Sequence, residues 1–282
     1  MMGISQLRFG LVVGLAALSG AALAQTTDKK DKGPWDVSVG LGVAYAPEYE
    51  GASKRAAGLA PDVNVSYKTD GYGTFALGSK AKGFSWTAID KEEYSLGVSL
   101  GFDGGRVDNK GGGGLRTGSK RLRGMGEIKS SLDYGVFGHV TAGVPISLQV
   151  IKNAGNGKVN NDRSINGSGG TRVELSVDVP WQISDSVSMS FSPNMVWADK
   201  KYTQTYFGVT STQAANSGFK AYNAKGGIKS VGLAVGANYK FTPNWSANVG
   251  VSFSRLQGDA AKSPLVQTKN QTSLAAGVAY TF

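Results

Sequence analysis

The sequence predicts an all-β protein, an antiparallel transmembrane β-barrel of about twelve strands that is closed by its C-terminal strand. Three observations lead to this fold. Apolar side chains recur at every second position in many short segments, the connections between these segments alternate between short and long, and the chain ends on an aromatic residue. The composition agrees, because 41 glycines and only 18% charged residues are typical of strands and tight turns rather than of a helical enzyme.

The N-terminus has the pattern of a secretory signal peptide. Arg8 precedes a short apolar run over residues 11–18, and Ala22-Leu23-Ala24 supplies the small residues that favour cleavage before Gln25. No later run reaches the roughly 20 apolar residues that a transmembrane helix needs. We therefore expect a signal peptide over residues 1–24, a periplasmic tail over 25–34 and a barrel over 35–282, in a protein exported through the periplasm to the outer membrane of a Gram-negative bacterium.

Alternation with a period of two places the strands in order along the chain. Clear apolar stripes run over 35–45, 94–102, 136–150, 173–181, 231–241 and 245–253, and weaker candidates lie near 57–68, 71–78, 82–89, 124–134 and 186–197. In the last strand, Leu274, Ala276, Val278, Tyr280 and Phe282 share one face, as expected for a wall between lipid and a polar lumen. We interpret Tyr280 and the terminal Phe282 as the signal that the barrel-assembly machinery recognises.

The connections fit a barrel whose two termini lie in the periplasm. Short connections are expected near 69–71, 90–92, 135, 182–185 and 242–243, and long ones over 46–56, 104–123, 151–170, 198–227 and 257–270. The exception is 79–81, which should face outward but is short. Aromatic residues at the strand ends beside the short turns predict a girdle at the periplasmic interface of the outer membrane. It is formed by Trp35, Tyr67, Tyr72, Tyr94, Tyr134, Trp181, Phe241, Trp245 and Tyr280.

Charged residues opposite the apolar stripes predict what the lumen contains. Glu127, Lys129 and Asp133 are expected on one strand, and Arg172, Glu174 and Asp178 on another. Because an unpaired charge in a confined space costs several kcal/mol, both signs of charge favour a salt-bridged, partly filled lumen over a wide selective pore. Whether water or a small solute passes is open at this point.

No residue pattern predicts catalysis, a cofactor or a metal site. His139 is the single histidine, and we expect it to be a hydrogen-bonded lumen residue; HExxH, GxSxG and P-loop motifs are missing from the sequence. The net charge of +10 would favour nucleic acid only in a protein that is not exported. Two interpretations of the basic loop that contains Arg116, Arg121 and Arg123 stay open, namely contact with lipopolysaccharide phosphates and simple solvation.

Three segments together resemble the MipA/OmpV family of outer-membrane proteins. The first, 40–51, contains Pro47, Glu48, Tyr49 and Gly51; the second, 197–209, contains Tyr206 and Phe207; the third, 255–266, contains Gly258, Asp259 and Pro264. The resemblance implies a barrel. In the best-known branch of the family it also implies a scaffold that interacts with a murein-degrading lytic transglycosylase and links it to a murein synthase, whereas other branches resemble adhesins or osmotic-response proteins.

Three functions therefore stand as hypotheses: a non-enzymatic scaffold for murein (peptidoglycan) enzymes, a narrow channel for small solutes, and a surface adhesin. Outer-membrane lipid and lipopolysaccharide are expected partners in each case. The glycines and prolines of the family motifs are expected to fold the outer loops into a lid over the barrel mouth, with Glu48 and Asp259 as internal hydrogen-bond acceptors.

Overall fold

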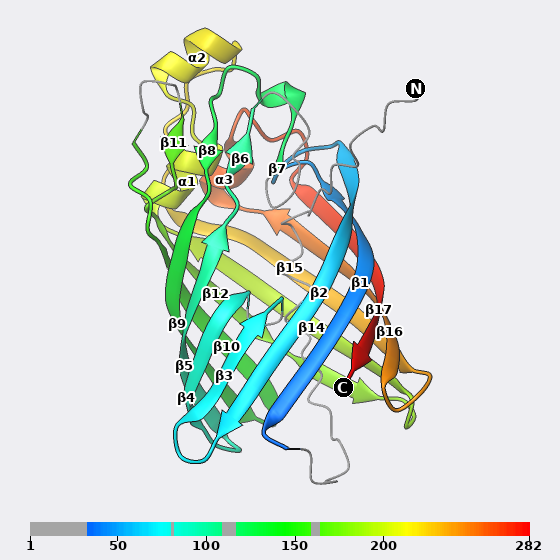
Figure 1. Cartoon of the computed structure of the whole chain (residues 1–282). Coiled ribbons are helices and arrows are strands. Elements are labelled where there is room, and N and C mark those ends of the chain that lie inside the picture. The colour runs from blue at the N-terminus through cyan, green and yellow to red at the C-terminus, as the bar shows by residue number, and fades with distance from the viewer. Residues whose placement is uncertain (1–32, 80–81, 109–116, 159–163) are drawn as a thin grey trace, which may run out of the picture.

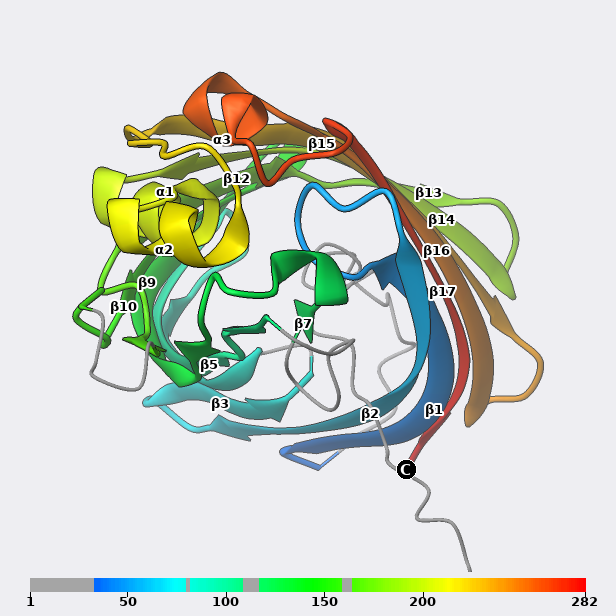
Figure 2. The ribbon, with the colours of Figure 1, turned by 90° about the horizontal axis from the view of Figure 1, so that it is seen from above.

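The protein forms a closed antiparallel β-barrel. The computed structural model describes residues 33–79, 82–108, 117–158 and 164–282. Within these residues, 13 strands form one sheet in the order β12-β10-β9-β5-β4-β3-β2-β1-β17-β16-β15-β14-β13, and β12 also pairs with β14 (Figures 1 and 2). Since β12 and β13 follow one another along β14, they share one place in the wall, and the described part of the chain has twelve strand positions around the lumen. The predicted fold class is confirmed.

The strands of the wall have the following bounds: β1 (Trp35–Pro47), β2 (Arg55–Thr69), β3 (Gly73–Gly78), β4 (Gly83–Asp90), β5 (Tyr94–Asp103), β9 (Ser131–Ala142), β10 (Val144–Asn153), β12 (Thr171–Val177), β13 (Val179–Gln182), β14 (Val187–Ala198), β15 (Gly227–Lys240), β16 (Trp245–Leu256) and β17 (Asn270–Thr281). A small second sheet and four short helices lie at one end: β6 (Arg106–Val107), β7 (Thr117–Gly118), β8 (Ile128–Lys129), β11 (Ile165–Asn166), η2 (Lys120–Leu122), α1 (Lys200–Phe207), α2 (Ser211–Ser217) and α3 (Gly258–Lys262).

The alternation of the sequence becomes the two faces of the wall. On β1, Leu41 and Val43 are more than half exposed on the outside, whereas Ser38 and Ala44 are buried on the lumen side. The first and last strands close the barrel through an antiparallel register in which Gly42 lies opposite Gly277. The outward apolar side chains therefore form the surface that contacts lipid.

One predicted turn and one predicted strand are wrong. The chain turns at Gly143 between β9 and β10, not at residue 135. The alternation hides this turn because Ala142 pairs with Val144, so the period of two continues unbroken through the hairpin. Gly143 supplies the positive φ of 77° that the turn needs.

As a consequence, the predicted strand over 124–134 does not form, and only residues 131–134 of it belong to the wall, as the start of β9. Glu127 and Lys129 lie outside the wall, where Lys129 belongs to β8 of the small sheet. Tyr134, predicted beside a short turn, instead lies near the start of β9, at the end of the barrel that carries the long connections. Short local alternation could not distinguish the two-residue strand β8 from a barrel strand.

The remaining connections follow the predicted alternation, and the short link between β3 and β4 is the predicted exception. The hairpin turns gather at one end of the barrel and the long connections at the other (Figure 1). The predicted girdle residues other than Tyr134 lie beside the hairpin turns, and several touch. Trp35 and Tyr67 have ring centroids 4.5 Å apart, and Trp245 and Tyr280 are 5.2 Å apart. Their role at the membrane interface, and that of Tyr280 and Phe282 in assembly, stay predictions.

None of the helices in the described part of the chain is long and apolar enough to cross a membrane.

The seam between β1 and β17 should not tolerate a side chain at Gly42. A Cβ atom there would lie 2.6 Å from the carbonyl oxygen of Ala276, which belongs to the backbone of the neighbouring strand and has little room to move. We expect Gly42→Ala to reduce the free energy of unfolding by about 1–3 kcal/mol, as overpacking typically does. Denaturant unfolding of the barrel in lipid measures this. Gly33→Ala is the control, because no atom lies within 4 Å of its added Cβ; equal stability of the two variants would contradict close packing at the seam.

Candidate functional site

The long connections fold into a lid over the outer mouth of the barrel (Figure 2). We define the lid as residues 48–54, 104–108, 117–130, 154–158, 164–170, 199–226 and 257–269. It has a hydrophobic core of its own, because side chains from four separate connections are buried together: Tyr49, Ala52, Leu122, Met125, Val209 and Leu265. A second cluster joins Phe207 and Ala260 to Leu256 at the end of β16. A loop cluster with this much apolar burial is a folded element rather than a set of solvated loops.

The family-like motifs lie within the contacts that hold the lid together. The hydroxyl of Tyr49 donates to the carbonyl of Leu265 at 2.9 Å. The backbone amide of Gly51 donates to the side chain of Gln271 at 3.1 Å, and Gly51 accepts hydrogen bonds from the chain just after Pro264 through its carbonyl. The first and last outer connections are therefore fastened to each other.

The predicted acceptors Glu48 and Asp259 also act inside the lid. Glu48 is paired with Lys54 at 3.1 Å, and its side chain is only 8% exposed. Asp259, beside Gly258 at the start of α3, accepts from the backbone amide of Lys225 at 2.9 Å. Pro47 ends β1 at the point where the lid begins. These contacts show that the motif residues stabilise the fold of the lid.

Helix α1 connects the lid to the barrel wall. Asp199 caps its N-terminus by accepting from the amide of Tyr202 at 2.8 Å, and its other carboxylate oxygen accepts from the amide of Thr171 at 2.8 Å. The hydroxyl of Tyr206 donates to the carboxylate of Asp103 at the end of β5. Burial raises the pKa of both Tyr202 and Tyr206, so both phenols stay protonated and Tyr206 can donate to Asp103.

Beneath α1, charged residues of the wall form a cluster around Arg172. Its guanidinium lies 2.8 Å from Asp133, 3.1 Å from Glu174 and 4.0 Å from Asp103. Lys82 adds a second cation, 3.0 Å from Glu174. The ring of Tyr202 covers the guanidinium at 5.6 Å. The cluster therefore holds three carboxylates and two cations at the outer end of the lumen.

Sequence reasoning placed Asp133, Arg172 and Glu174 on the lumen face. The structure brings them together with Asp103 and Lys82, which were not selected as lumen charges. Asp103 could have been found, because it follows the apolar stripe of its strand and must face the lumen. Lys82 lies just before β4, in the short connection that the predicted alternation did not explain. The pairing of Lys82 with Glu174 depends on where β12 lies relative to β4, and no local sequence pattern predicts this.

Asp178 lies apart from this cluster, at the break between β12 and β13. Its carboxylate accepts from Ser192 at 2.6 Å and from Ser147 at 3.5 Å, and the Ser147 hydroxyl is 2.7 Å from Nδ1 of His139. Here the serine lies between the histidine and the aspartate, whereas a Ser-His-Asp catalytic triad needs the histidine in the middle. Among the residues with described positions, no group of three or more His, Cys, Asp or Glu could hold a metal ion.

The lid also holds several arginines, one of which is buried. Arg106 is 2% exposed; its Nη1 donates to the carbonyl of Tyr206 at 2.6 Å, whereas its Nε and Nη2 have no partner among the described residues. Burial raises the pKa of Tyr49, and the nearby guanidinium groups of Arg121 and Arg106 oppose this rise. Of the basic residues selected from the sequence, Arg121 and Arg123 lie in and beside η2, and Arg116 is outside the described residues.

Removing the cation of the lumen cluster should destabilise the barrel strongly. Arg172→Gln leaves Asp103, Asp133 and Glu174 close together without their central counter-charge, and we expect a loss of about 3–5 kcal/mol in the free energy of unfolding. Lys68→Gln is the control, since Lys68 and Asp90 form an exposed pair at 3.8 Å worth at most about 1 kcal/mol. Denaturant unfolding compares the two; equal losses would mean that the cluster contributes little.

Solved structures of outer-membrane channels are similar to this chain at low sequence identity. The NanC porin is 9% identical with a TM-score of 0.40, over 88% of this chain and 100% of that chain. The channel DcaP of Acinetobacter baumannii is 7% identical with a TM-score of 0.41, over 88% of this chain and 96% of that chain.

Two relatives found by sequence share a higher identity with this chain than these solved structures do. The MltA-interacting protein of Escherichia coli (strain K12) is 28% identical over 86 residues, which cover 30% of this chain and 34% of the relative. The outer membrane protein Omp26La of Vibrio anguillarum is 37% identical over 81 residues, covering 29% of this chain and 31% of the relative. The matched stretch thus spans about a third of each of these relatives.

A family model described as MltA-interacting protein MipA matches residues 39–282, from the first strand of the barrel to the last residue. With the closed barrel and the outer-membrane relatives, this match places the protein in the outer membrane of a Gram-negative bacterium. The chain belongs to the MltA-interacting protein MipA family.

Proposed function

We propose that the protein is a non-enzymatic outer-membrane scaffold that binds a murein-degrading lytic transglycosylase, together with a murein synthase, at the periplasmic end of the barrel. The lid is the observation that carries this proposal. Its buried core and its contacts with the Arg172 cluster favour a covered outer mouth over a wide pore. The family description and the name of the Escherichia coli relative, MltA-interacting protein, support the choice of partner.

The contact surface would combine three parts. A stable interface usually buries about 800 Å² on each partner, which is more than tight hairpin turns provide. The turns carry exposed residues such as Tyr72, which is 74% exposed. The tail over 25–34, most of which lies outside the described residues, would add area, and a lipid-anchored enzyme would add contacts in the membrane plane.

The scaffold proposal predicts direct binding in solution. Mature protein folded in detergent should bind a purified lytic transglycosylase from the same cell with a Kd in the micromolar range or tighter. Deleting residues 25–34 should weaken binding at least tenfold, whereas replacing them by a Gly/Ser segment of equal length tests whether side chains or mere length matter. Biolayer interferometry with the barrel immobilised measures both effects.

A variant of the outer surface is the matched control for this experiment. Lys201→Gln changes an exposed charge on the lid, at the opposite end of the barrel, and should leave binding unchanged. Absence of saturable binding by the unaltered protein, with lipid present, would contradict the scaffold and place the channel hypothesis first.

A narrow channel is the second candidate. The polar side chains that line the lumen toward the hairpin turns favour it. His139 is exposed toward the lumen, and the Ser147, Asp178 and Ser192 side chains join it in a hydrogen-bonded chain along the wall. Small solutes could enter such a lumen from the periplasmic end. The two functions differ in whether the lid blocks passage.

Conductance separates these functions. We expect the intact protein to show no stepwise conductance in planar bilayers and a variant lacking residues 203–224 to show it, because this deletion removes most of α1 and all of α2 from the mouth. The chain ends can be rejoined, since Gly226 packs against the backbone of Asp199 and Lys200. Tyr206→Phe, which removes only the hydroxyl bound to Asp103, is the control and should stay silent. Stepwise conductance of the intact protein would contradict a closed mouth.

A further inference from the structure

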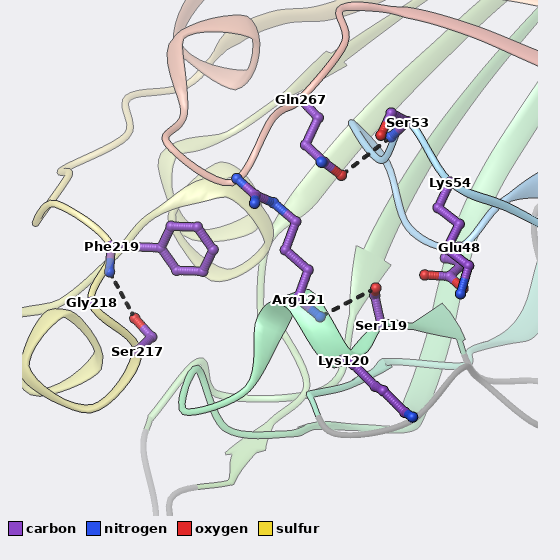
Figure 3. A pocket seen from close by; sticks show the side chains of 10 residues that line it. All are labelled: Glu48, Ser53, Lys54, Ser119, Lys120, Arg121, Ser217, Gly218, Phe219 and Gln267. Atoms are coloured by element: carbon purple, nitrogen blue, oxygen red, sulfur yellow. Dashed lines mark hydrogen bonds and ion pairs between the residues drawn. The ribbon is translucent and has the colours of Figure 1, made fainter.

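The outer surface of the lid contains a pocket with a volume of about 710 Å³ (Figure 3). Its walls come from four segments far apart in the sequence, represented by Lys54, Ser119, Arg121, Phe219 and Gln267. Binding sites for small molecules typically measure about 300–1,000 Å³, so the pocket has room for a mono- or disaccharide. Neither the barrel wall nor the proposed periplasmic contact explains it.

Arg121 extends into the pocket between Phe219 and Gln267 (Figure 3). Its guanidinium carbon lies 5.2 Å from the centre of the Phe219 ring, a cation–π contact that holds the planar group in one orientation. The backbone on both sides is fixed as well. The amide of Arg121 donates to the hydroxyl of Ser119 at 3.4 Å, and the amide of Phe219 donates to the hydroxyl of Ser217 at 3.3 Å. A stacked guanidinium keeps N–H donors along its edge that suit paired hydrogen bonds to an oxyanion.

The pocket has more positive than negative charge. Lys54, Lys120 and Arg121 line it together with a single carboxylate, Glu48, which is already paired with Lys54 at 3.1 Å. Neither Lys120 nor Arg121 has a carboxylate within ion-pair distance among the residues described. The buried Arg106 adds positive charge nearby, since both it and Arg121 lie close enough to the hydroxyl of Tyr49 to lower its pKa.

The neutral lining adds a hydrogen-bond donor. The side-chain oxygen of Gln267 accepts from the backbone amide of Ser53 at 3.3 Å, while its NH2 group makes no hydrogen bond within the described part of the chain. A ligand that fits must therefore offer several acceptors and at least one negative charge. A neutral apolar molecule would leave the guanidinium and the amide desolvated without partners, which is costly.

We infer that this pocket binds an anionic saccharide, a sugar that carries a carboxylate or a phosphate. The guanidinium of Arg121 binds the anionic group, Gln267 donates to ring hydroxyls, and Phe219 provides the apolar side of the site. The sugar can be free or part of lipopolysaccharide, because both present the same chemistry at the outer surface.

Calorimetric titration of the mature protein, folded in detergent at fixed ionic strength, tests this inference without any periplasmic partner. Glucuronate and glucose 6-phosphate should bind, and glucose should bind at least tenfold more weakly. Arg121→Gln should weaken the anionic sugars at least tenfold, with Arg121→Lys between the two. Arg123→Gln is the matched control, because it removes an exposed arginine of the same turn that does not line the pocket, and it should change nothing.

A second measurement identifies the source of the sugar. If Arg121→Gln, but not Arg123→Gln, loses lipopolysaccharide that co-purifies with the protein, lipopolysaccharide supplies the ligand; if retention is equal while soluble sugars still bind, the ligand is free. Should Arg121→Gln fail to fold, Phe219→Leu replaces it, with an expected loss of about threefold or more. Equal weakening by Arg121→Gln and Arg123→Gln, or no binding of any anionic sugar or lipopolysaccharide, would overturn the inference.

Discussion

The pairing of backbone hydrogen bonds in lipid is the constraint on which the whole structure depends. Because no water is available in the bilayer core, every N–H and C=O group there must find a partner within the protein, and a closed sheet is the arrangement of strands that achieves this. The pairing of β1 with β17 completes the circle. The facing glycines, Gly42 and Gly277, let the two strands approach closely at this seam.

Closure creates a second constraint inside the wall. A narrow lumen holds charges only when they are paired, and the Arg172 cluster meets this condition with Lys82 and three carboxylates. The same cluster gives α1 a place to dock, through Tyr202 above Arg172 and Tyr206 on Asp103. Lid and lumen thus stabilise each other, and a wide aqueous path would require both to rearrange.

The two ends of the barrel consequently offer different surfaces. The outer end is a folded, donor-rich surface with a pocket around Arg121, suited to acidic sugars. The other end carries the hairpin turns, and in the proposed scaffold it would bind a partner that is itself held at the membrane. A scaffold of this kind would meet the saccharides of the outer leaflet on one side and murein enzymes on the other, without a need for solute flow between them.

Local sequence patterns predicted the barrel, the two faces of its wall, the alternation of its connections and the lumen position of Asp133, Arg172 and Glu174, because a period of two is a local property of each strand. They did not reveal the turn at Gly143, where the alternation passes through the hairpin unchanged, and so Glu127 and Lys129 were assigned to a strand that does not exist. Which loops meet depends on how all the strands are arranged around the barrel. The pocket around Arg121 and the pairing of Lys82 with Glu174 join residues distant in sequence, and no local pattern encodes such distances.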